Sequence, residues 1–386
     1  MKIVGIICEY NPFHLGHAKQ IRKIKEIMGD DTAIVCLMSG NFVQRGMPAI
    51  FDKSLRTAAA IEAGADLVLE LPVTKCLSSA EGFAAGGVQI LGKFCDYLCF
   101  GSETGNEETL MATAKALLSD DFPAKLKLEL EKGCSFPAAR QAALGELGKL
   151  LENPNDILAV EYCKAIINEK CNMKPLVIRR EGSYHDVVAD HENPSATAIR
   201  QLIGKGEDFS HFVPDTSLYD GATIHDITFG EQAILYRLRT MSDDEFQALP
   251  YGTEGLWNKF MDACRKCSRL EQIIAATKSK RYTRSRIDRM VMCATLGISQ
   301  EILERSIPYC RILGLNDQGR VVLNMAREHG SFPNIGTKME DSYQQLERRC
   351  DDIYALFAAQ AGAAGQADKR RIVYYGKNGK KEISGC

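Results

Sequence analysis

The sequence lacks a long hydrophobic run and an excess of charge of either sign. The apolar N-terminal run from Met1 to Cys8 is followed at once by the charged Glu9, so it is too short for a signal peptide or a membrane span. The formal net charge is only −2 over 386 residues, which excludes a polybasic scaffold and confines any nucleic-acid contact to a local patch. We therefore expect a cytoplasmic globular protein that makes no contact with a membrane.

Cysteine spacing for a metal site is also missing, although the chain has 14 cysteines. The motif Cys264-x-x-Cys267 lies in a helical pattern and has no second Cys or His pair at zinc spacing. Most other cysteines lie inside apolar runs, as Cys36 and Cys99 do, where they behave as small buried hydrophobic residues. The sequence therefore predicts neither a disulfide framework nor a bound structural metal.

The first half of the chain alternates short apolar runs with helical patterns. Expected strands are 2–8, 32–38, 66–71, 96–100 and 174–178, and expected helices include 53–64 and 79–91. Strands separated by helices form right-handed crossovers, which build a parallel sheet covered by helices. Such a sheet binds its ligands at the carboxyl ends of the strands. The expected fold class is therefore α/β, with a Rossmann-like parallel sheet.

The pattern changes near residue 210, in a chain that is longer than one typical domain. Beyond this point the β-rich runs nearly vanish, and helical periodicity appears in 230–241, 254–267 and 299–307. We therefore expect two domains, 1–210 with the sheet and 211–386 mainly α-helical. An Ala- and Gly-rich segment, 358–365, and the basic tail after it are typical of a linker followed by a terminal strand or a disordered end.

The strongest functional signal is the segment His14-Leu15-Gly16-His17, which directly follows the first strand and opens a helix. Gly16 lets a ligand approach the backbone, and the helix N-terminus supplies unpaired N–H groups for an anion. His14 and His17 are three residues apart and share one helical face, which suits two donors directed at one phosphate. This arrangement predicts an ATP-using adenylyl-transfer enzyme. Lys19 is close enough in sequence to meet the leaving pyrophosphate.

A second polar segment, Ser195 to Arg200, follows the strand expected at 174–178. By itself it is an ordinary helix N-cap with a short helix. Together with the first segment it resembles the two halves of the nucleotidyltransferase superfamily with the H-x-G-H signature. In that superfamily the hydroxyl groups and the arginine of the second motif bind the outer phosphates, which implies this role for Ser195, Thr197 and Arg200. Ala196 stands where that pattern has a serine, so one of its hydroxyl contacts is not available here.

Longer segments of the sequence narrow the resemblance from the superfamily to one family. They are 5–17 around the histidine pair, Met38–Gly46, Phe100–Glu103, Asn153–Asp156 and the basic Lys280–Arg286. Together they resemble the tRNA(Met) cytidine acetate ligase family over nearly the whole chain. The resemblance implies that ATP activates acetate to acetyl-adenylate. It also implies that the acetyl group then passes to the exocyclic amine of the wobble cytidine of elongator tRNA(Met), which gives N4-acetylcytidine.

The same resemblance implies which residues contact ATP. They are Ile7, Cys8, Glu9, Tyr10, Asn11, Pro12, Phe13, His14, Leu15, Gly16, His17, Ala18, Lys19, Gln20, Gly101, Asn153, Ser195, Thr197 and one of the two arginines Arg179 and Arg180. The resemblance does not distinguish between these two arginines. Catalysis is expected from His14, His17, Lys19 and Arg200.

Acetate is already ionised, so it attacks the α-phosphorus of ATP without a general base, and this step needs positioning and charge neutralisation. Asn41 and Gln44 follow the second strand at its carboxyl end, and by analogy with related carboxylate-activating enzymes they are candidates for holding acetate. A polar turn without a ligand explains them equally well. No carboxylate pair has a convincing spacing for a metal, so Mg²⁺ is expected to be carried on the ATP phosphates.

One basic segment stands out in the second half of this slightly acidic chain. It consists of six cations and an interleaved tyrosine: Lys278, Lys280, Arg281, Tyr282, Arg284, Arg286 and Arg289. Such a cluster is typical of contacts to a phosphate backbone, and a tyrosine can stack on a base. A solvated charged face is the plain alternative. With the resemblance, the segment is predicted to bind tRNA, and no protein partner is evident.

Three other functions fit parts of the sequence. A small-molecule adenylyltransferase acting on phosphopantetheine or nicotinate mononucleotide needs little more than the first domain, so the helical second half argues against it. A carboxylate-amine ligase like pantothenate synthetase shares the adenylate step but uses a small amine. A catalytically silent RNA-binding protein would keep only the nucleotide fold. Incorporation of labelled acetate, with and without tRNA, distinguishes these functions.

Overall fold

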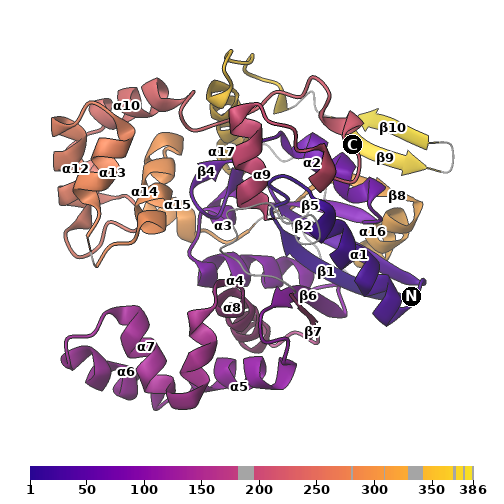
Figure 1. The fold of residues 1–386 in the computed structure, drawn as a ribbon, viewed down its shortest axis with the longest axis horizontal. Coiled ribbons are helices and arrows are strands. Elements are labelled where there is room, and N and C mark those ends of the chain that lie inside the picture. Colours follow the sequence, from indigo (N-terminus) through magenta and orange to yellow (C-terminus); the bar gives the residue numbers. More distant parts are fainter. Residues whose placement is uncertain are drawn as a thin grey trace.

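The computed structural model describes residues 1–180, 195–279, 281–307, 309–328, 342–367, 371–376 and 379–384. Its centre is an eight-stranded sheet with the order β10-β9-β8-β5-β2-β1-β6-β7 (Figure 1). Five neighbouring strands from the first half of the chain are parallel: β1 Lys2–Cys8, β2 Thr32–Ser39, β5 Leu67–Leu71, β6 Tyr97–Ser102 and β7 Lys174–Arg179. The expected α/β class with a parallel sheet is confirmed.

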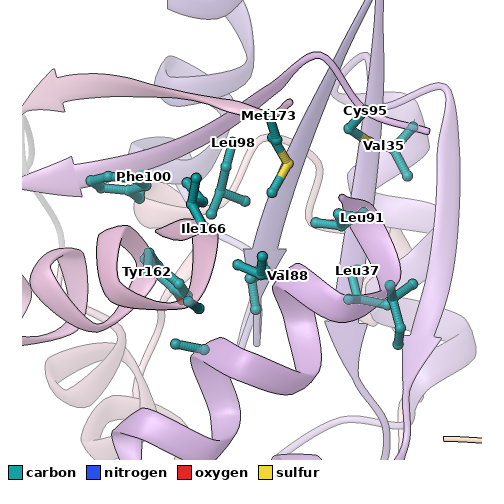
Figure 2. Packing of buried hydrophobic residues seen from close by; sticks show 14 of the residues in the cluster. Val35, Leu37, Val88, Leu91, Cys95, Leu98, Phe100, Tyr162, Ile166 and Met173 are labelled. Atoms are coloured by element: carbon teal, nitrogen blue, oxygen red, sulfur yellow. The ribbon is translucent and has the colours of Figure 1, made fainter. Parts of the chain in front are cut away.

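Helices cover this sheet on both faces, so its central strands are buried on both sides. All eight residues of β2 are buried, as expected for a strand of a doubly covered parallel sheet. One face packs on α1 Leu15–Met28 and α2 Lys53–Glu62. The other packs on α4 Ala80–Leu91, α8 Pro154–Glu169 and α16 Asp317–Glu328. Figure 2 shows this second face, where Val88 and Leu91 of α4 lie beside Leu37 and Leu98 of the sheet.

The strand order reverses next to β1. Strands β2 and β5 lie on one side of β1, whereas β6 and β7 lie on the other. In an open parallel sheet, such a reversal opens a crevice beyond the carboxyl ends of the strands. Strands β1, β6 and β7 end at Cys8, Ser102 and Arg179. The histidine segment, the Gly101 region and Arg180 therefore reach the same edge of the sheet.

Three strands that follow residue 210 extend the same sheet. β8 Arg311–Asn316 pairs antiparallel with β5, β9 Arg371–Gly376 pairs parallel with β8, and β10 Gly379–Ser384 pairs antiparallel with β9. The sequence did not predict β8, because its six residues follow a helical pattern and begin and end with polar side chains. The Asn316 carboxamide donates to Asp66 at 2.8 Å, which fixes β8 beside β5. The second half of the chain therefore also contributes to the sheet.

The helices after residue 210 form a core of their own. They are α10 Glu231–Thr240, α11 Asp243–Gln247, α12 Leu256–Lys266, α13 Leu270–Thr277, α14 Arg284–Leu296, α15 Gln300–Glu304 and, after β8 and α16, α17 Ser342–Tyr354. Buried Phe246, Phe260 and Met290 belong to this core, together with Phe42 and Leu77 from the first half. The helical part therefore packs directly on the sheet, and a domain boundary at residue 210 stays a prediction.

The remaining elements of the described residues are short or peripheral. They are α3 Val73–Cys76, α5 Glu107–Leu117, α6 Phe122–Glu131, α7 Phe136–Leu144, α9 Ala196–Lys205, the strand pair β3 Phe42–Val43 and β4 Met47–Pro48, and four 3₁₀ turns at Gly145–Glu152, Ser210–Phe212, Ser217–Tyr219 and Ala355–Phe357. Helices α6 and α7 project at the lower left of Figure 1. No helix in the described part of the chain is long and apolar enough to cross a membrane.

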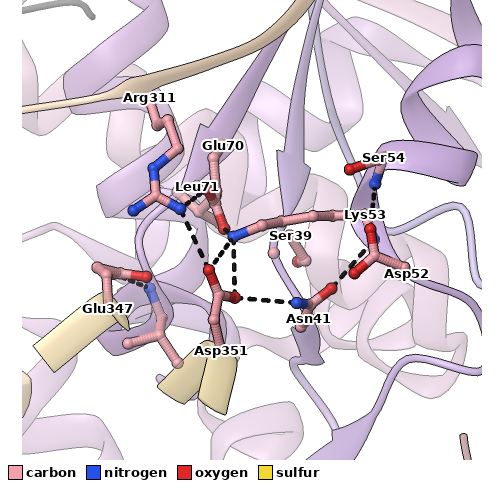
Figure 3. Close-up of polar contacts among 12 residues, drawn as sticks. Ser39, Asn41, Asp52, Lys53, Ser54, Glu70, Leu71, Arg311, Glu347 and Asp351 are labelled. Carbon is pink, nitrogen blue, oxygen red and sulfur yellow. Dashed lines mark hydrogen bonds and ion pairs between the residues drawn. The ribbon is translucent and has the colours of Figure 1, made fainter. Parts of the chain in front are cut away.

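A buried cluster of charges joins α17 to the sheet (Figure 3). The fully buried Lys53 ammonium donates to Glu70 at 2.6 Å and to the two carboxylate oxygens of Asp351 at 3.0 and 2.9 Å. Arg311 of β8 approaches the same two carboxylates at 3.4 and 3.3 Å. Burial, and then the nearby Glu70, raise the pKa of Glu347 to about 8, so Glu347 is protonated at neutral pH. Two cations therefore balance two carboxylates, as buried charges require.

Candidate active site

The histidines of the signature segment cap the start of α1. His14 is the N-cap residue, and its Nδ1 accepts a hydrogen bond from the backbone N–H of Gly16 at 3.1 Å. The Nδ1 of His17 in turn accepts from the backbone N–H of His14 at 3.3 Å. The two rings are stacked, with their centroids 3.7 Å apart. Both imidazoles are therefore held by the helix end that they cap.

These hydrogen bonds determine which ring nitrogen carries the proton. An Nδ1 atom that accepts a hydrogen bond carries no hydrogen, so in a neutral imidazole the hydrogen is on Nε2. Burial, followed by the charges of Arg180 and Arg200, lowers the pKa of His14 to about 3. Burial, followed by His14 and Arg180, also lowers the pKa of His17. Both rings are therefore neutral at pH 7, and each has an Nε2–H donor left for a ligand.

A cavity of 1490 Å³ lies beside these histidines and reaches the strand-order reversal next to β1. Its inner part is lined by Glu9, Asn11, His14, Gly16, His17, Lys19, Gln20, Gly101, Arg179, Arg180, Ser195, Thr197 and Arg200. Its outer part is lined by segments 222–229 and 359–362 and by Arg284 and Asp288 of α14, whereas Arg45 lies close enough to Glu9 and Arg200 to affect their pKa values. A small-molecule site usually occupies about 300 to 1,000 Å³, so this cavity has room for a nucleotide and a second ligand.

Only part of the predicted ATP-contact stretch faces the cavity. Seven of its members do not line the cavity: Ile7, Cys8, Tyr10, Pro12, Phe13, Leu15 and Ala18. Tyr10 and Phe13 are buried and pack edge to face, with ring centroids 4.8 Å apart. The carbonyl oxygen of Phe13 accepts a hydrogen bond from the Tyr219 hydroxyl at 3.2 Å. These buried residues hold the loop from behind, while the polar residues of the same stretch face the ligand space.

The second motif is bonded to the first. Ser195 caps α9, since its hydroxyl accepts from the backbone N–H of Ala198 at 3.1 Å. One terminal nitrogen of Arg200 donates to the Thr197 hydroxyl at 3.1 Å, and the other donates to the carbonyl oxygen of Asn11 at 2.6 Å. The structure therefore brings Ser195, Thr197 and Arg200 to the same cavity as the histidines, as the sequence predicted.

Arg179, the last residue of β7, and Arg180, which follows it, both line the cavity, but they pack against different neighbours. Arg180 lies over Gly101, where an added Cβ would come within 3.0 Å of its Cγ. The charge of Arg180 also lowers the pKa of both signature histidines, so the guanidinium is near them. Arg179 packs instead against Gly105, where an added Cβ would lie 2.8 Å from the Arg179 Cβ. Arg180 is therefore the arginine that acts on the histidine pair.

The segments Phe100–Glu103 and Asn153–Asp156 bind each other. Buried Asp156 accepts hydrogen bonds from the Ser102 hydroxyl and, at 3.0 Å, from the backbone N–H of Glu103. The Glu103 carboxylate accepts in return from the backbone N–H of Asp156 at 2.9 Å. Asn153 donates to Asp156 at 3.1 Å and does not line the cavity. Asn153 therefore supports the Gly101 strand end from behind, and its contact with ATP stays a prediction.

The two acetate candidates also lie off the cavity surface. Asn41 is buried in the charge cluster of Figure 3, where it donates to Asp351 at 2.9 Å and accepts from the backbone N–H of Lys53 at 3.0 Å. The Gln44 side chain donates to the Ser78 carbonyl at 3.4 Å. Both carboxamides are engaged in the fold, so their assignment to acetate stays a prediction without geometric support.

The basic run is placed at the start of α14, and much of it is paired within the chain. Arg284 binds Glu271 with both terminal nitrogens at 2.7 and 2.9 Å and Asp288 through Nε at 2.8 Å. Arg286 donates twice to the carbonyl oxygen of Tyr251, at 3.0 and 2.7 Å. These bonds hold the helix start to its neighbours. Arg284 nevertheless lines the outer part of the cavity.

Tyr282 does not present its ring to a ligand, contrary to the predicted stacking on a base. It is only 8% exposed, and its hydroxyl donates to the carbonyl oxygen of Glu254 at 3.1 Å. The ring is buried because it belongs to the apolar core of the helical part.

Among the described cations of the run, Lys278 is exposed. Arg281 keeps 66% of its side chain exposed while it pairs with Glu254.

The last two members of the basic run are Arg289 and Lys280. The guanidinium of Arg289 lies over the ring of Tyr251, 4.9 Å from its centroid. Lys280 lies outside the described residues. Lys278, Arg281 and Arg284 are therefore the exposed cations among the predicted tRNA contacts that the structure describes, and Arg284 is bonded to two carboxylates.

The sequence did not identify the outer wall of the cavity. Ile224 and Phe229 are 38% and 48% exposed there, although both are large and apolar. The backbone N–H of His225 donates to the Ile50 carbonyl at 2.9 Å, and that of Asp226 donates to the Phe357 carbonyl at 2.8 Å. Segment 222–229 is therefore held by residues far away in the chain, which no local pattern reveals.

Comparison with known proteins defines the class first. The family model described as HIGH Nucleotidyl Transferase matches residues 1–369, so the chain belongs to this class of nucleotidyltransferases. A Clostridium novyi protein named tRNA(Met) cytidine acetate ligase is 38% identical, and the match covers 92% of this chain and 93% of that protein. One of the same name from Alkaliphilus metalliredigens is 35% identical and is matched over 98% and 99%. Within the class, the chain belongs to the tRNA(Met) cytidine acetate ligase family.

Solved structures agree with this placement. The apo crystal structure of Thermotoga maritima TmcAL superposes with a TM-score of 0.88 at 28% identity, covering 98% of this chain and all of that one. The form bound with alpha-thio ATP superposes with a TM-score of 0.86 over the same shares. The fold of this chain is therefore the fold of a protein that binds an ATP analogue.

Proposed function

We propose that the protein activates acetate with ATP to acetyl-adenylate and transfers the acetyl group to N4 of the wobble cytidine of elongator tRNA(Met), forming N4-acetylcytidine. AMP and pyrophosphate are released, so the protein is a ligase. The observation that carries the proposal is the pair of neutral imidazoles at the start of α1, which line one cavity with Arg180 and Arg200. The names of the curated relatives support the same reaction.

The inner part of the cavity suits the phosphates of ATP. The Nε2–H groups of His14 and His17 are preorganised donors for a phosphate that gains charge during displacement. Gly16 is needed here, because an added Cβ would lie 2.9 Å from the His14 ring and would displace that donor. Arg200, bonded to the Asn11 carbonyl at 2.6 Å, supplies a fixed cation for the outer phosphates. Lys19 adds positive charge for the pyrophosphate that leaves.

Acetate then attacks the α-phosphorus as an anion. Its approach to a triphosphate is opposed by like charge, so the cations of the inner part lower the barrier by neutralising that charge. No proton has to move in this step. The imidazoles therefore act as hydrogen-bond donors, which their neutral state permits.

Magnesium is proposed to enter with the nucleotide. Among the described residues, no group of three or more His, Cys, Asp or Glu side chains is arranged to hold a metal ion. The phosphate oxygens of ATP would then be the main ligands of Mg²⁺, which supplies charge neutralisation for the departing pyrophosphate. The residues of this chain that act toward the same charge are Arg180 and Arg200.

The outer part of the cavity is proposed to admit the acceptor base. A wobble cytidine lies in a single-stranded loop and can be extruded, after which an aromatic side chain can hold it by stacking. The half-exposed ring of Phe229 offers such a surface, with Ile224 beside it on the same wall. Lys278 and Arg281 are exposed cations on the helical part and would contact RNA phosphates.

One assay tests the proposal. The protein is incubated with radiolabelled acetate and ATP, with and without bulk tRNA. Label in RNA that depends on ATP supports the proposal, whereas label only in a small product indicates a ligase for a small amine. Absence of acetate-dependent pyrophosphate release contradicts both. Adenylation of a small substrate without acetate would indicate a small-molecule adenylyltransferase, and RNA binding without any turnover would indicate a silent RNA-binding protein.

A further inference from the structure

The transfer step requires the removal of a proton, which the adenylation step does not. When the N4 amine of cytidine attacks the acetyl carbonyl carbon, a C–N bond forms and the nitrogen gains positive charge. A proton must leave this nitrogen, and the C–O bond to AMP breaks with its electron pair passing to the phosphate. This requirement rests on the proposed function, and it calls for a proton acceptor in the cavity.

The signature histidines do not offer a lone pair for this proton. The Nδ1 lone pairs of His14 and His17 accept the backbone N–H groups of Gly16 and His14, at 3.1 and 3.3 Å. The Nε2 atoms carry the hydrogen of the neutral rings. The imidazoles are therefore donors in both half-reactions, and the proton of the amine has to go elsewhere.

Three carboxylates line the cavity among the described residues, and two of them are committed to the outer wall. Asp226 accepts from the backbone N–H and the hydroxyl of Thr228, at 2.8 and 2.6 Å. Asp288 accepts from Arg284 at 2.8 Å. The third carboxylate is Glu9, which directly follows β1 and precedes the histidine segment. Glu9 is therefore the acid nearest in the chain to the residues that hold the phosphates.

Other basic groups of the cavity are less suited. His225 lies on the outer wall with its ring stacked on Tyr354, 3.9 Å between centroids. Lys19 and Lys23 are ammonium groups that donate rather than accept. Glu9 thus remains as the proton acceptor of the inner part.

The structure holds Glu9 by one bond to its carboxylate and one bond to its main chain. One carboxylate oxygen accepts from the backbone N–H of Gln44 at 2.7 Å. The carbonyl oxygen of Glu9 accepts from the buried guanidinium of Arg56 at 2.6 Å, so the main chain is fixed as well. Only one oxygen of the carboxylate is tied to Gln44, and the side chain still lines the cavity. A fixed carboxylate beside the reacting atoms costs little reorganisation when it takes a proton.

Charged and titratable groups face Glu9 from several elements. They are Arg200 of α9, Arg45 of the β3–β4 turn and Arg56 of α2, with the thiol of Cys76 and the phenol of Tyr162 also near. Burial raises the pKa of Glu9, and the Gln44 N–H and the three arginines offset part of this rise. A carboxylate with a raised pKa is a stronger base than an exposed one.

We propose that Glu9 is the general base of the transfer step and takes the proton of the N4 amine as this amine attacks the acetyl carbonyl. The electron pair of the broken C–O bond leaves with AMP. The protonated carboxyl of Glu9 then loses its proton to water in the open cavity, which restores the starting state.

The test separates the two half-reactions in Glu9→Gln. Glutamine keeps the size of the side chain and the oxygen that accepts from Gln44, but it cannot take the proton. Adenylation is measured as acetate-dependent pyrophosphate release, and transfer as a single turnover from preformed acetyl-adenylate to unmodified tRNA(Met). We expect the transfer rate constant to fall roughly 10²- to 10⁴-fold, while adenylation falls less than about tenfold and the KM for tRNA changes less than about threefold.

The pH profile gives a readout that a structural role would not change. The parental transfer rate rises with pH as Glu9 ionises and then levels off, and Glu9→Gln lacks this rise. Glu9→Asp keeps the carboxylate but retracts it by one methylene, so it retains part of the transfer and the rise with pH. Glu26→Gln is the matched control, because it makes the same change at a carboxylate of α1 that is 63% exposed and lies outside the cavity. Its transfer rate is expected to stay within about threefold of the parental rate.

Two results overturn the inference. Transfer by Glu9→Gln at the parental rate, or with the parental pH rise, would leave the phosphate of the adenylate itself as the proton acceptor. Equal loss of both half-reactions in Glu9→Gln and Glu9→Asp would give Glu9 a purely structural role. If the parental protein acetylates no tRNA, the proposed function fails instead, and this outcome is distinct because no substitution is involved.

Discussion

The guanidinium of Arg200 donates a hydrogen bond of 2.6 Å to the carbonyl oxygen of Asn11, which lies 189 residues earlier in the chain. This bond joins the two polar motifs of the cavity across the sheet edge. It also fixes the direction of the cation, because the other terminal nitrogen is bonded to Thr197 at 3.1 Å. The arginine is therefore set before the nucleotide arrives, which is what electrostatic catalysis requires.

Replacing Arg200 with alanine is expected to damage adenylation far more than transfer. The charge that develops on the leaving pyrophosphate loses a cation, so pyrophosphate release should fall by about 10²-fold or more. Preformed acetyl-adenylate should restore acetylation of tRNA. Arg22→Ala removes an exposed arginine of α1 that pairs with Glu26 and serves as the control. If preformed acetyl-adenylate fails to rescue Arg200→Ala while tRNA binding is normal, the role assigned to Arg200 is wrong.

Phe229→Ala is expected to weaken the transfer step only. Stacking of a base on an aromatic ring is worth roughly 1–3 kcal/mol, so kcat/KM for tRNA should fall about 5- to 150-fold. Pyrophosphate release without tRNA should stay near the parental level, and Phe229→Tyr should retain most of the transfer. The control is Phe136→Ala, which removes a ring of similar exposure from α7, outside the cavity. Equal effects of the two alanine variants would contradict the stacking of the acceptor base on Phe229.

The double variant Lys278→Ala and Arg281→Ala tests the RNA contact of the helical part. Each lost phosphate contact reduces the slope of log affinity against log salt by roughly 0.7, so the slope should flatten by about 1.4. Arg265→Ala with Lys266→Ala removes the same charge from α12, where both cations are exposed, and should leave the slope unchanged. Unchanged tRNA binding in the first variant would indicate that the basic run is a solvated charged face and does not contact RNA.

Much of the fold follows from the sequence because its parallel strands are continuous apolar runs. The predicted strand 2–8 agrees with β1 Lys2–Cys8, and the helix predicted at 79–91 agrees with α4 Ala80–Leu91. β8 was missed because its apolar run, 312–315, is short, is flanked by polar residues and follows a helical pattern. What makes it a strand is its pairing with β5, which begins 244 residues earlier, and such long-range pairing leaves no local signal.

The candidate site was predictable where a motif is local and not where it is assembled. The strand-to-helix segment with His14 and His17 is contiguous, so its place at the cavity could be inferred. Arg180 could be distinguished from Arg179 only from the packing around Gly101. Tyr282 was predicted as a stacking residue, but the helical core takes up its ring. The outer wall with Phe229 depends on backbone bonds to distant residues and had no signal in the sequence.

The buried charge cluster makes stability depend on pH through Glu347. Its pKa in the folded protein is raised to about 8, so between about pH 4.5 and pH 8 the folded state binds more protons than the unfolded state. This group therefore lowers the free energy of unfolding as the pH rises through that window, by at most about 1.4 kcal/mol per pH unit. Glu347→Gln keeps the oxygen that accepts from the Val73 backbone N–H at 2.8 Å and removes this titration. The mutant should gain stability relative to the parent between pH 6 and pH 8.5 in urea unfolding. If the difference in the free energy of unfolding between mutant and parent is the same at pH 6 and at pH 8.5, the raised pKa of Glu347 is contradicted.

Two neutral imidazoles on the first turn of α1 are proposed to donate hydrogen bonds to the phosphate at which acetate is activated. The most direct test is the rate of acetate-dependent pyrophosphate release from ATP in His14→Ala and His17→Ala, with His211→Ala, an exposed histidine outside the cavity, as the control. Loss of one preorganised donor should lower the rate roughly 10²- to 10³-fold in each signature variant, and the control should match the parent. Rates above about a tenth of the parental value in both signature variants would contradict the account.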